Sequence, residues 1–160
     1  MIDYNQFPNE SRVWIYQSNT AFSEEQANLL RKKLQHFVAQ WQSHGAPVKA
    51  WADIKYNRFI VLMVDENQEA PSGCSIDSSV AMIKEIEVEM NVDLFDRLNF
   101  AYKTDSSTVE SADRIDFSNL YASSIINDQT IVFNNLVNTK IDLENKWEVP
   151  LADSWHANMV

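Results

Sequence analysis

The only thiol of the chain stands in a run of small polar residues. Cys74 belongs to the segment Ser-Gly-Cys-Ser-Ile-Asp-Ser-Ser at residues 72–79, directly before a helical pattern. The first turn of a helix offers free N–H groups and the positive end of the helix dipole, which stabilise a thiolate or a bound anion. The sequence therefore places a candidate ligand-binding site here, made of Ser72, Gly73, Cys74, Ser75, Asp77 and Ser78.

A cysteine nucleophile also needs a base to accept its proton. His156 and His44 are the candidates, and with Cys74 they would form the catalytic set of a thiol-dependent hydrolase or transferase. A structural interpretation is favoured over this one. A free cysteine commonly packs as a small hydrophobe, Ser75 or Asp77 would cap the helix, and His44 would place its charge at the C-terminus of the preceding helix.

Acidic side chains are concentrated in the middle of the chain. The protein has 160 residues and a net charge of −10, and residues 63–128 hold 14 acidic against 4 basic side chains. Such a surface repels phosphate backbones and disfavours anions beside residues 72–79. We therefore expect an unknown protein or a neutral or cationic small molecule as the partner, with phosphate compounds excluded from this site and no nucleic acid bound.

The composition excludes several classes of protein. The two glycines, Gly45 and Gly73, cannot form a nucleotide-binding glycine loop, and a single cysteine excludes internal disulfides and multi-cysteine zinc sites. The three histidines have no metal-ligand spacing, so neither a metal site nor a cofactor is expected. The longest apolar run, residues 59–64, is too short to cross a membrane, and residues 1–11 lack the charged-then-apolar pattern of a signal peptide, so export through such a signal is not expected. We expect a cytoplasmic protein with no membrane span.

The hydrophobic pattern predicts the elements that must position these residues. A first strand covers residues 12–17, and a helix begins after a Ser23–Gln26 capping box and extends to His44, with Gly45 just beyond its end. A hairpin follows at residues 48–64. A second helix after residue 73 ends near Asn91, and a fourth strand covers residues 97–103.

This order predicts an α+β protein with a ferredoxin-like β-α-β-β-α-β antiparallel sheet. We expect one globular domain over residues 1–160, with the ferredoxin-like core at 12–103 and a C-terminal α/β extension at 104–160. In the extension, residues 104–116 are a polar connection and 117–126 a helical segment. A short strand at 130–133 and a helix at 140–147 capped by Thr139 complete it.

The C-terminal segment is also a candidate interface. Trp147 and Trp155 flank Pro150, and they either clamp the segment back over the sheet or, in the case of Trp155, anchor a second subunit. No catalytic pattern is stronger than its structural interpretation. The leading hypothesis is therefore a binding or interaction module that self-associates through a sheet edge or this segment, and the thiol-dependent enzyme is the alternative.

Five strings carry a resemblance that covers nearly the whole chain. They are RVWIYQSN at 12–19, SGCSIDSS at 72–79, LFDR at 94–97, VFNNLV at 132–137 and SWH at 154–156. Together they resemble a family of short bacterial proteins of unknown function, whose members often carry the label ABC transporter ATPase. The resemblance implies a small cytosolic bacterial protein and supplies no catalytic residue. ATP hydrolysis is not expected, because the sequence has neither the phosphate loop with its lysine nor a Leu-Ser-Gly-Gly signature loop.

Overall fold

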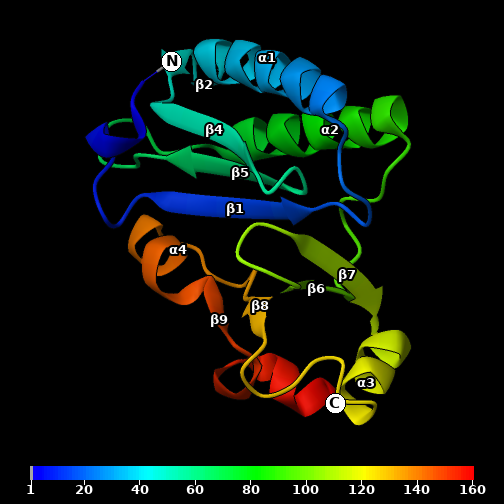
Figure 1. Ribbon diagram of the computed structural model, residues 1–160. Coiled ribbons are helices and arrows are strands. Elements are labelled where there is room, and N and C mark those ends of the chain that lie inside the picture. Colours follow the sequence, from blue (N-terminus) through cyan, green and yellow to red (C-terminus); the bar gives the residue numbers. More distant parts are fainter. Residues whose placement is uncertain (1) are drawn as a thin grey trace.

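Three antiparallel strands form the first sheet, in the order β1-β5-β4 (Figure 1). The computed structural model describes residues 2–160, and in it β1 is Arg12–Gln17, β4 is Ala50–Lys55 and β5 is Phe59–Val64. Every residue of β5 is buried, as its unbroken apolar run predicts for a central strand. Tyr56 and Asn57 turn the chain between β4 and β5 with positive φ angles of 54° and 50°. The predicted hairpin is confirmed.

Two long helices cover one face of this sheet (Figure 1). Helix α1 is Glu24–Gln40, and its predicted capping box is present, because the Ser23 hydroxyl accepts from the N–H of Gln26 and the Gln26 side chain accepts from the N–H of Ser23. Helix α2 is Gly73–Met90. It ends at Asn91, whose left-handed backbone with φ of 52° stops the helix where the sequence predicts.

The end of α1 differs from the prediction. The helix stops at Gln40, and Trp41 is extended, with its indole N–H donating to the carbonyl of Ser75 at 2.9 Å. A small hairpin of β2, Gln42–Ser43, and β3, Ala46–Pro47, follows. His44 therefore occupies an exposed turn rather than the last turn of a helix. Gly45 lies in the turn of this hairpin rather than just beyond a helix end, because the chain leaves the helix at Trp41, whose indole is buried.

The predicted fourth strand forms but does not join the first sheet. It is β6, Asn99–Lys103, and it pairs with β7, Val109–Asp113, on one side and with β8, Ile131–Phe133, on the other. The ferredoxin-like order requires this strand beside β1, so that order is not confirmed, although the α+β class is. Hairpin pairing with the nearby β7 closes a short loop at low entropic cost. With β8 on its second edge, β6 has no edge left for β1.

The C-terminal half builds the second sheet, in the order β7-β6-β8-β9. The predicted polar connection at 104–116 contains β7, whose weak alternation gave no strand signal. The strand at 130–133 and the Thr139-capped helix are confirmed as β8 and as α4, Lys140–Lys146, which lead into β9, Glu148–Pro150. Helix α3 is Arg114–Ala122, and the chain finishes in 3-10 turns, Leu151–Asp153 and Trp155–Met159.

The layers alternate along the long direction of the molecule (Figure 1). The helices α1 and α2 pack on the first sheet, whose opposite face packs on α4 with its C-cap residue Trp147 and on Phe133 of the second sheet. The outer face of the second sheet packs on α3 and the C-terminal turns through Phe100, Phe117 and Leu151. A boundary between two sheets therefore runs through the middle of the protein, beside β1.

Candidate functional site

The small polar segment at residues 72–79 hydrogen-bonds mainly to itself. The Ser72 hydroxyl accepts from the N–H of Ser75 at 3.2 Å, so Ser72 rather than Ser75 or Asp77 is the N-cap of α2. The hydroxyls of Ser75 and Ser78 donate to carbonyls three residues earlier in the chain, at 3.0 and 2.8 Å. Cys74 is exposed, and none of these residues lines the cavity beside Trp14 and Trp155 or the cavity beside Arg114 and Val160. The segment is a capped helix start.

The candidate bases lie in different places. His156 is 1% exposed and packs against Phe117 beneath the second sheet, whereas Cys74 lies beyond the first sheet on α2. His44 is in the β2–β3 turn, whose neighbour Ser43 accepts a hydrogen bond from the N–H of Ser72 at 3.1 Å. Within residues 2–160, no hydrogen bond joins Cys74 to a histidine. His156 is therefore separate from Cys74, whereas His44 follows the residue that contacts Ser72, and the pairing of His44 with Cys74 stays a prediction.

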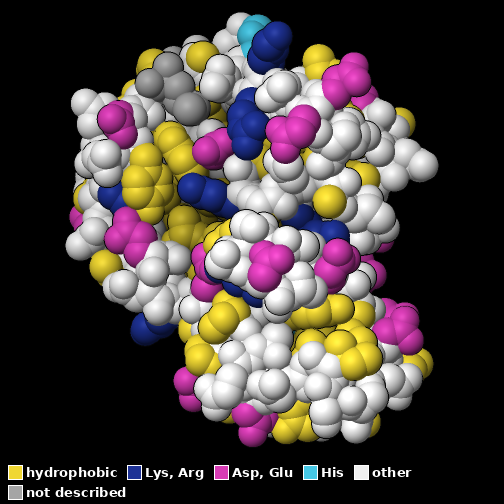
Figure 2. Space-filling view, viewed as in Figure 1, with side chains coloured by type: hydrophobic (Ala, Val, Ile, Leu, Met, Phe, Trp, Pro, Cys, Tyr) yellow, Lys and Arg dark blue, Asp and Glu magenta, His cyan; other side chains and the backbone are white. Residues whose placement is uncertain are grey.

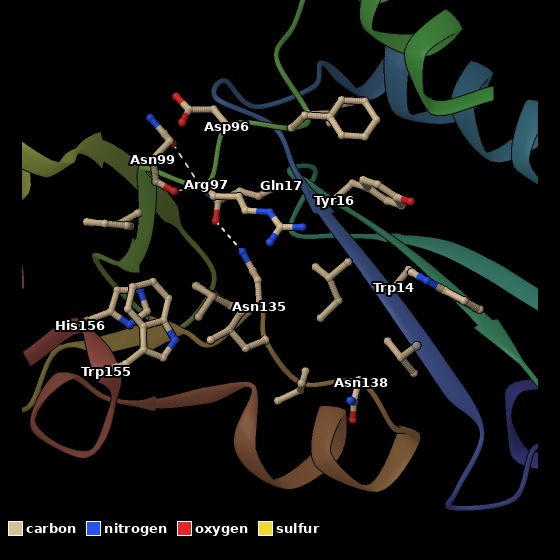
Figure 3. Close-up of a pocket in the computed structure, with 18 of the residues that line it drawn as sticks. Trp14, Tyr16, Gln17, Asp96, Arg97, Asn99, Asn135, Asn138, Trp155 and His156 are labelled. Carbon is tan, nitrogen blue, oxygen red and sulfur yellow. Dashed lines mark hydrogen bonds between the residues drawn. The ribbon is translucent and has the colours of Figure 1, made fainter. Parts of the chain in front are cut away.

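A cleft of about 470 Å³ lies instead between the two sheets (Figure 3). Its walls come from four segments that are far apart in the sequence: β1, the loop before β6, the segment after β8, and the C-terminal turn. Residues that line it include Trp14, Ile15, Gln17, Leu94, Asp96, Arg97, Asn99, Asn135, Leu136, Asn138, Trp155 and His156. Apolar walls with a few convergent polar groups are typical of a ligand site.

A chain of side-chain amides closes the back of the cleft. Gln17, only 8% exposed, donates to the backbone carbonyl of Asn99 at 2.7 Å and to its side-chain oxygen at 3.1 Å (Figure 3). Asn135 donates to the Gln17 side-chain oxygen at 2.9 Å and accepts from the Trp147 indole at 2.9 Å. Each amide has its partners, so this network ties β1 to the second sheet in one arrangement.

An indole stacked on an imidazole forms one wall of the cleft (Figure 3). The Trp155 and His156 rings lie 3.8 Å apart at 20°, and the Trp155 indole donates to the Asn134 side chain at 2.9 Å. The Nδ1 atom of His156 is 2.6 Å from the Ser154 hydroxyl. Burial lowers the pKa of His156 from 6.5 to about 4, so the ring is neutral at neutral pH. Within residues 2–160, no hydrogen bond uses its Nε2.

The mouth of the cleft carries more positive than negative charge. The charged residues that line it are Arg12, Asp96 and Arg97. Arg12 forms an exposed ion pair with Glu66 at 3.5 Å, whereas no carboxylate in residues 2–160 comes within 4.0 Å of a nitrogen of Arg97. Arg97 reaches into the cleft beside β1 (Figure 3). On the face seen in Figure 2, acidic side chains are scattered over both halves rather than gathered in one patch.

Sequence reasoning missed most of this cleft. Of the predicted site residues only His156 and Trp155 line it, and Trp155 as a subunit anchor stays a prediction. The signal that could have found the cleft is the Asn-Asn pair at 134–135 in a chain with five tryptophans, because buried indoles need acceptors. Each of these asparagines accepts from one C-terminal indole.

Metal-ligand clusters, membrane-spanning helices and similarity to known proteins are further guides to function. Within residues 2–160, no group of three or more His, Cys, Asp or Glu side chains is placed to hold a metal ion. No helix in the same part of the chain has the length and apolar character that a membrane crossing requires. Comparison with protein-family models, curated proteins and solved structures found no match. The geometry of the cleft therefore carries the functional argument.

Proposed function

We propose that this protein is a binding module whose ligand occupies the cleft between the two sheets. The observation that carries the proposal is a cleft of about 470 Å³ that combines apolar walls with Arg97, a cation that has no ion-pair partner in residues 2–160. Volumes of this size are typical of sites for small molecules and short peptide segments. The amide chain behind the cleft fixes its shape before a ligand arrives, which lowers the entropic cost of binding.

The arrangement of the walls favours binding over catalysis. The imidazole in the cleft, that of His156, has its Nδ1 atom beside the Ser154 hydroxyl, and its lowered pKa makes it a weak base. The one nucleophilic thiol, Cys74, lies on the other side of the first sheet. No nucleophile and base converge on the cleft among the described residues, so turnover is not expected there.

A fragment screen by NMR tests the location of the site. With the tryptophan indole N–H signals assigned, we expect fragments to shift the Trp14 and Trp155 signals, whose residues line the cleft, and to leave unchanged the signal of Trp51, which packs on Tyr4. Asn138→Trp places an indole in the cleft from an exposed cleft residue and should abolish these shifts. Asn28→Trp, on the exposed face of α1, is the matched control and should bind as the unaltered protein does. Fragments that bind equally to Asn138→Trp would overturn the proposal.

The thiol-dependent hydrolase or transferase remains the alternative, and the exposure of Cys74 is the observation in its favour. A broad activity screen with Cys74→Ser as the control separates the two functions. Turnover that disappears in Cys74→Ser would establish the thiol-dependent enzyme and contradict the binding-module proposal. With Cys74 remote from His156, we expect the rate of thiol alkylation to be unchanged in His156→Gln.

Self-association and family membership also belong to the proposal. A second copy would pair through a sheet edge or through the C-terminal segment that contains Trp155. Light scattering at high protein concentration tests this clause, and a strictly monomeric result would remove it. The resemblance to short cytosolic bacterial proteins fits a binding role without ATP hydrolysis, which calorimetric titration with Mg-ATP would check.

A further inference from the structure

The backbone of β1 has one edge that β5 does not use. In an antiparallel pair, the N–H and C=O groups of alternate residues point to opposite edges. The N–H of Val13 donates to the carbonyl of Asn138 at 2.9 Å, on the side away from β5, and the N–H of Ser18 donates to Arg58 on the β5 side. By the same alternation, Ile15 and Gln17 direct their backbone groups away from β5, into the cleft that they line.

Part of this edge is already paired. Ser11 accepts from the N–H of Lys140 at 2.9 Å, and the Val13–Asn138 bond extends the pairing by one step. Beyond Gln17, the amide chain joins β1 to Asn99 and Asn135. Between these two closures lie the C=O of Val13, both backbone groups of Ile15 and the N–H of Gln17. No hydrogen bond found in residues 2–160 uses any of these four groups.

Three of these groups, the two of Ile15 and the N–H of Gln17, match one short strand, because Asn138 already stands opposite Val13. An incoming antiparallel chain would exchange two hydrogen bonds with Ile15 and accept one from the N–H of Gln17. Such a chain would lie where the ferredoxin-like order places its fourth strand, a position that β6 leaves empty. Recognition by strand addition uses main-chain bonds for affinity and the flanking side chains for specificity.

The flanking side chains select for charge. Arg12, at one end of the open stretch, is paired with Glu66, whereas Arg97, beside the other end, has no ion-pair partner in residues 2–160. The unpaired guanidinium of Arg97 can offer a carboxylate of the ligand a charge-assisted contact inside the cleft. We propose that the cleft binds an acidic peptide segment, which adds as an extended strand to the edge of β1 at Ile15. This inference rests on the proposed function and specifies its ligand.

A displayed library of random octapeptides, selected on the protein and counter-selected on Asn138→Trp, tests the inference. We expect enriched peptides to be rich in Asp and Glu and to weaken with added salt. N-methylation of one peptide amide at a time should abolish binding at every second position, because only alternate N–H groups face β1. Arg97→Gln should weaken binding about tenfold, the effect of losing one charge-assisted contact. Arg114→Gln, an exposed arginine outside the cleft, should leave it unchanged.

Amide hydrogen exchange provides a measurement that needs no variant. In the free protein the Ile15 amide should exchange much faster than those of Trp14 and Tyr16, which pair with β5, and bound peptide should protect it. An Ile15 amide that is slow in the free monomer would overturn the open edge. Protection that appears only in a dimer would assign the edge to a second copy instead. If no acidic peptide is enriched while fragments still bind the cleft, the peptide inference fails and the binding module stands.

Discussion

The buried imidazole of His156 should make the protein sensitive to mild acid. His156 is 1% exposed, and burial lowers its pKa from 6.5 to about 4 in the folded protein. As the pH falls through 6.5, the unfolded chain takes up a proton that the folded chain refuses, so the free energy of unfolding decreases. The loss begins near pH 6.5 and is complete below the folded pKa, with nothing lost above pH 7.5.

The two pKa values set the size of this effect. Linkage gives a loss of about 2 kcal/mol by pH 5 and about 3 kcal/mol by pH 4, relative to neutral pH. Such a loss is a large share of the 5 to 15 kcal/mol by which domains are usually stable. Carboxyl groups also titrate near pH 4, and a comparison of variants removes their contribution.

Urea unfolding at a series of pH values measures the effect. In His156→Gln, the free energy of unfolding should fall between pH 7 and pH 4 by about 3 kcal/mol less than in the unaltered protein, whatever its stability at neutral pH. His36→Gln and His44→Gln remove exposed imidazoles and should follow the unaltered protein. Parallel curves for His156→Gln and the unaltered protein would refute the reasoning, because they would show that the buried ring has no depressed pKa.

Two further predictions concern stability. Asn135→Ala removes the acceptor of the Trp147 indole and the donor to Gln17, so we expect a loss of about 2 to 4 kcal/mol in urea unfolding, whereas exposed Asn28→Ala should change it by less than about 0.5 kcal/mol. Ser72→Ala should cost about 1 kcal/mol through loss of the α2 cap, and Asp77→Ala almost nothing; the reverse order would contradict the observed N-cap.

Local signals allowed the sequence to predict much of the first sheet and its helices. Ser23 and Gln26 are three residues apart and form their capping box within one helical turn. The turn at Tyr56 and Asn57 joins two strands that follow each other in the sequence. The sheet that β6 joins could not be predicted in this way, because its pairing with β8 brings Tyr102 beside Val132 across a long stretch of chain. Both β1 and β8 are apolar strands that could pair with the second edge of β6. The hydrophobic pattern does not show which of them will pair.

The sequence likewise predicted only part of the candidate site, the part that depends on local signals. The composition of residues 72–79 correctly marks a helix start, but the serine hydroxyls are used by the helix itself. The cleft draws its walls from residues as distant as Ile15, Arg97 and His156, none of which stands in a chemical motif. Many of its polar groups are backbone atoms and side-chain amides, which occur throughout any protein sequence. The backbone groups of Ile15 become candidate ligand contacts only because folding leaves them without hydrogen-bond partners in residues 2–160.

The closure of the β1 edge by residues 138–140 has a consequence for how the chain folds as it is made. The first sheet and its two helices are complete in sequence by Met90, long before Asn138 leaves the ribosome. During that interval the whole edge from Ser11 to Gln17 is open to other nascent chains, and unpaired edges are the usual starting points of aggregation. Residues 138–140 therefore cover this edge late in synthesis, and a chain that stalls after α2 would be the form of this protein most prone to aggregate.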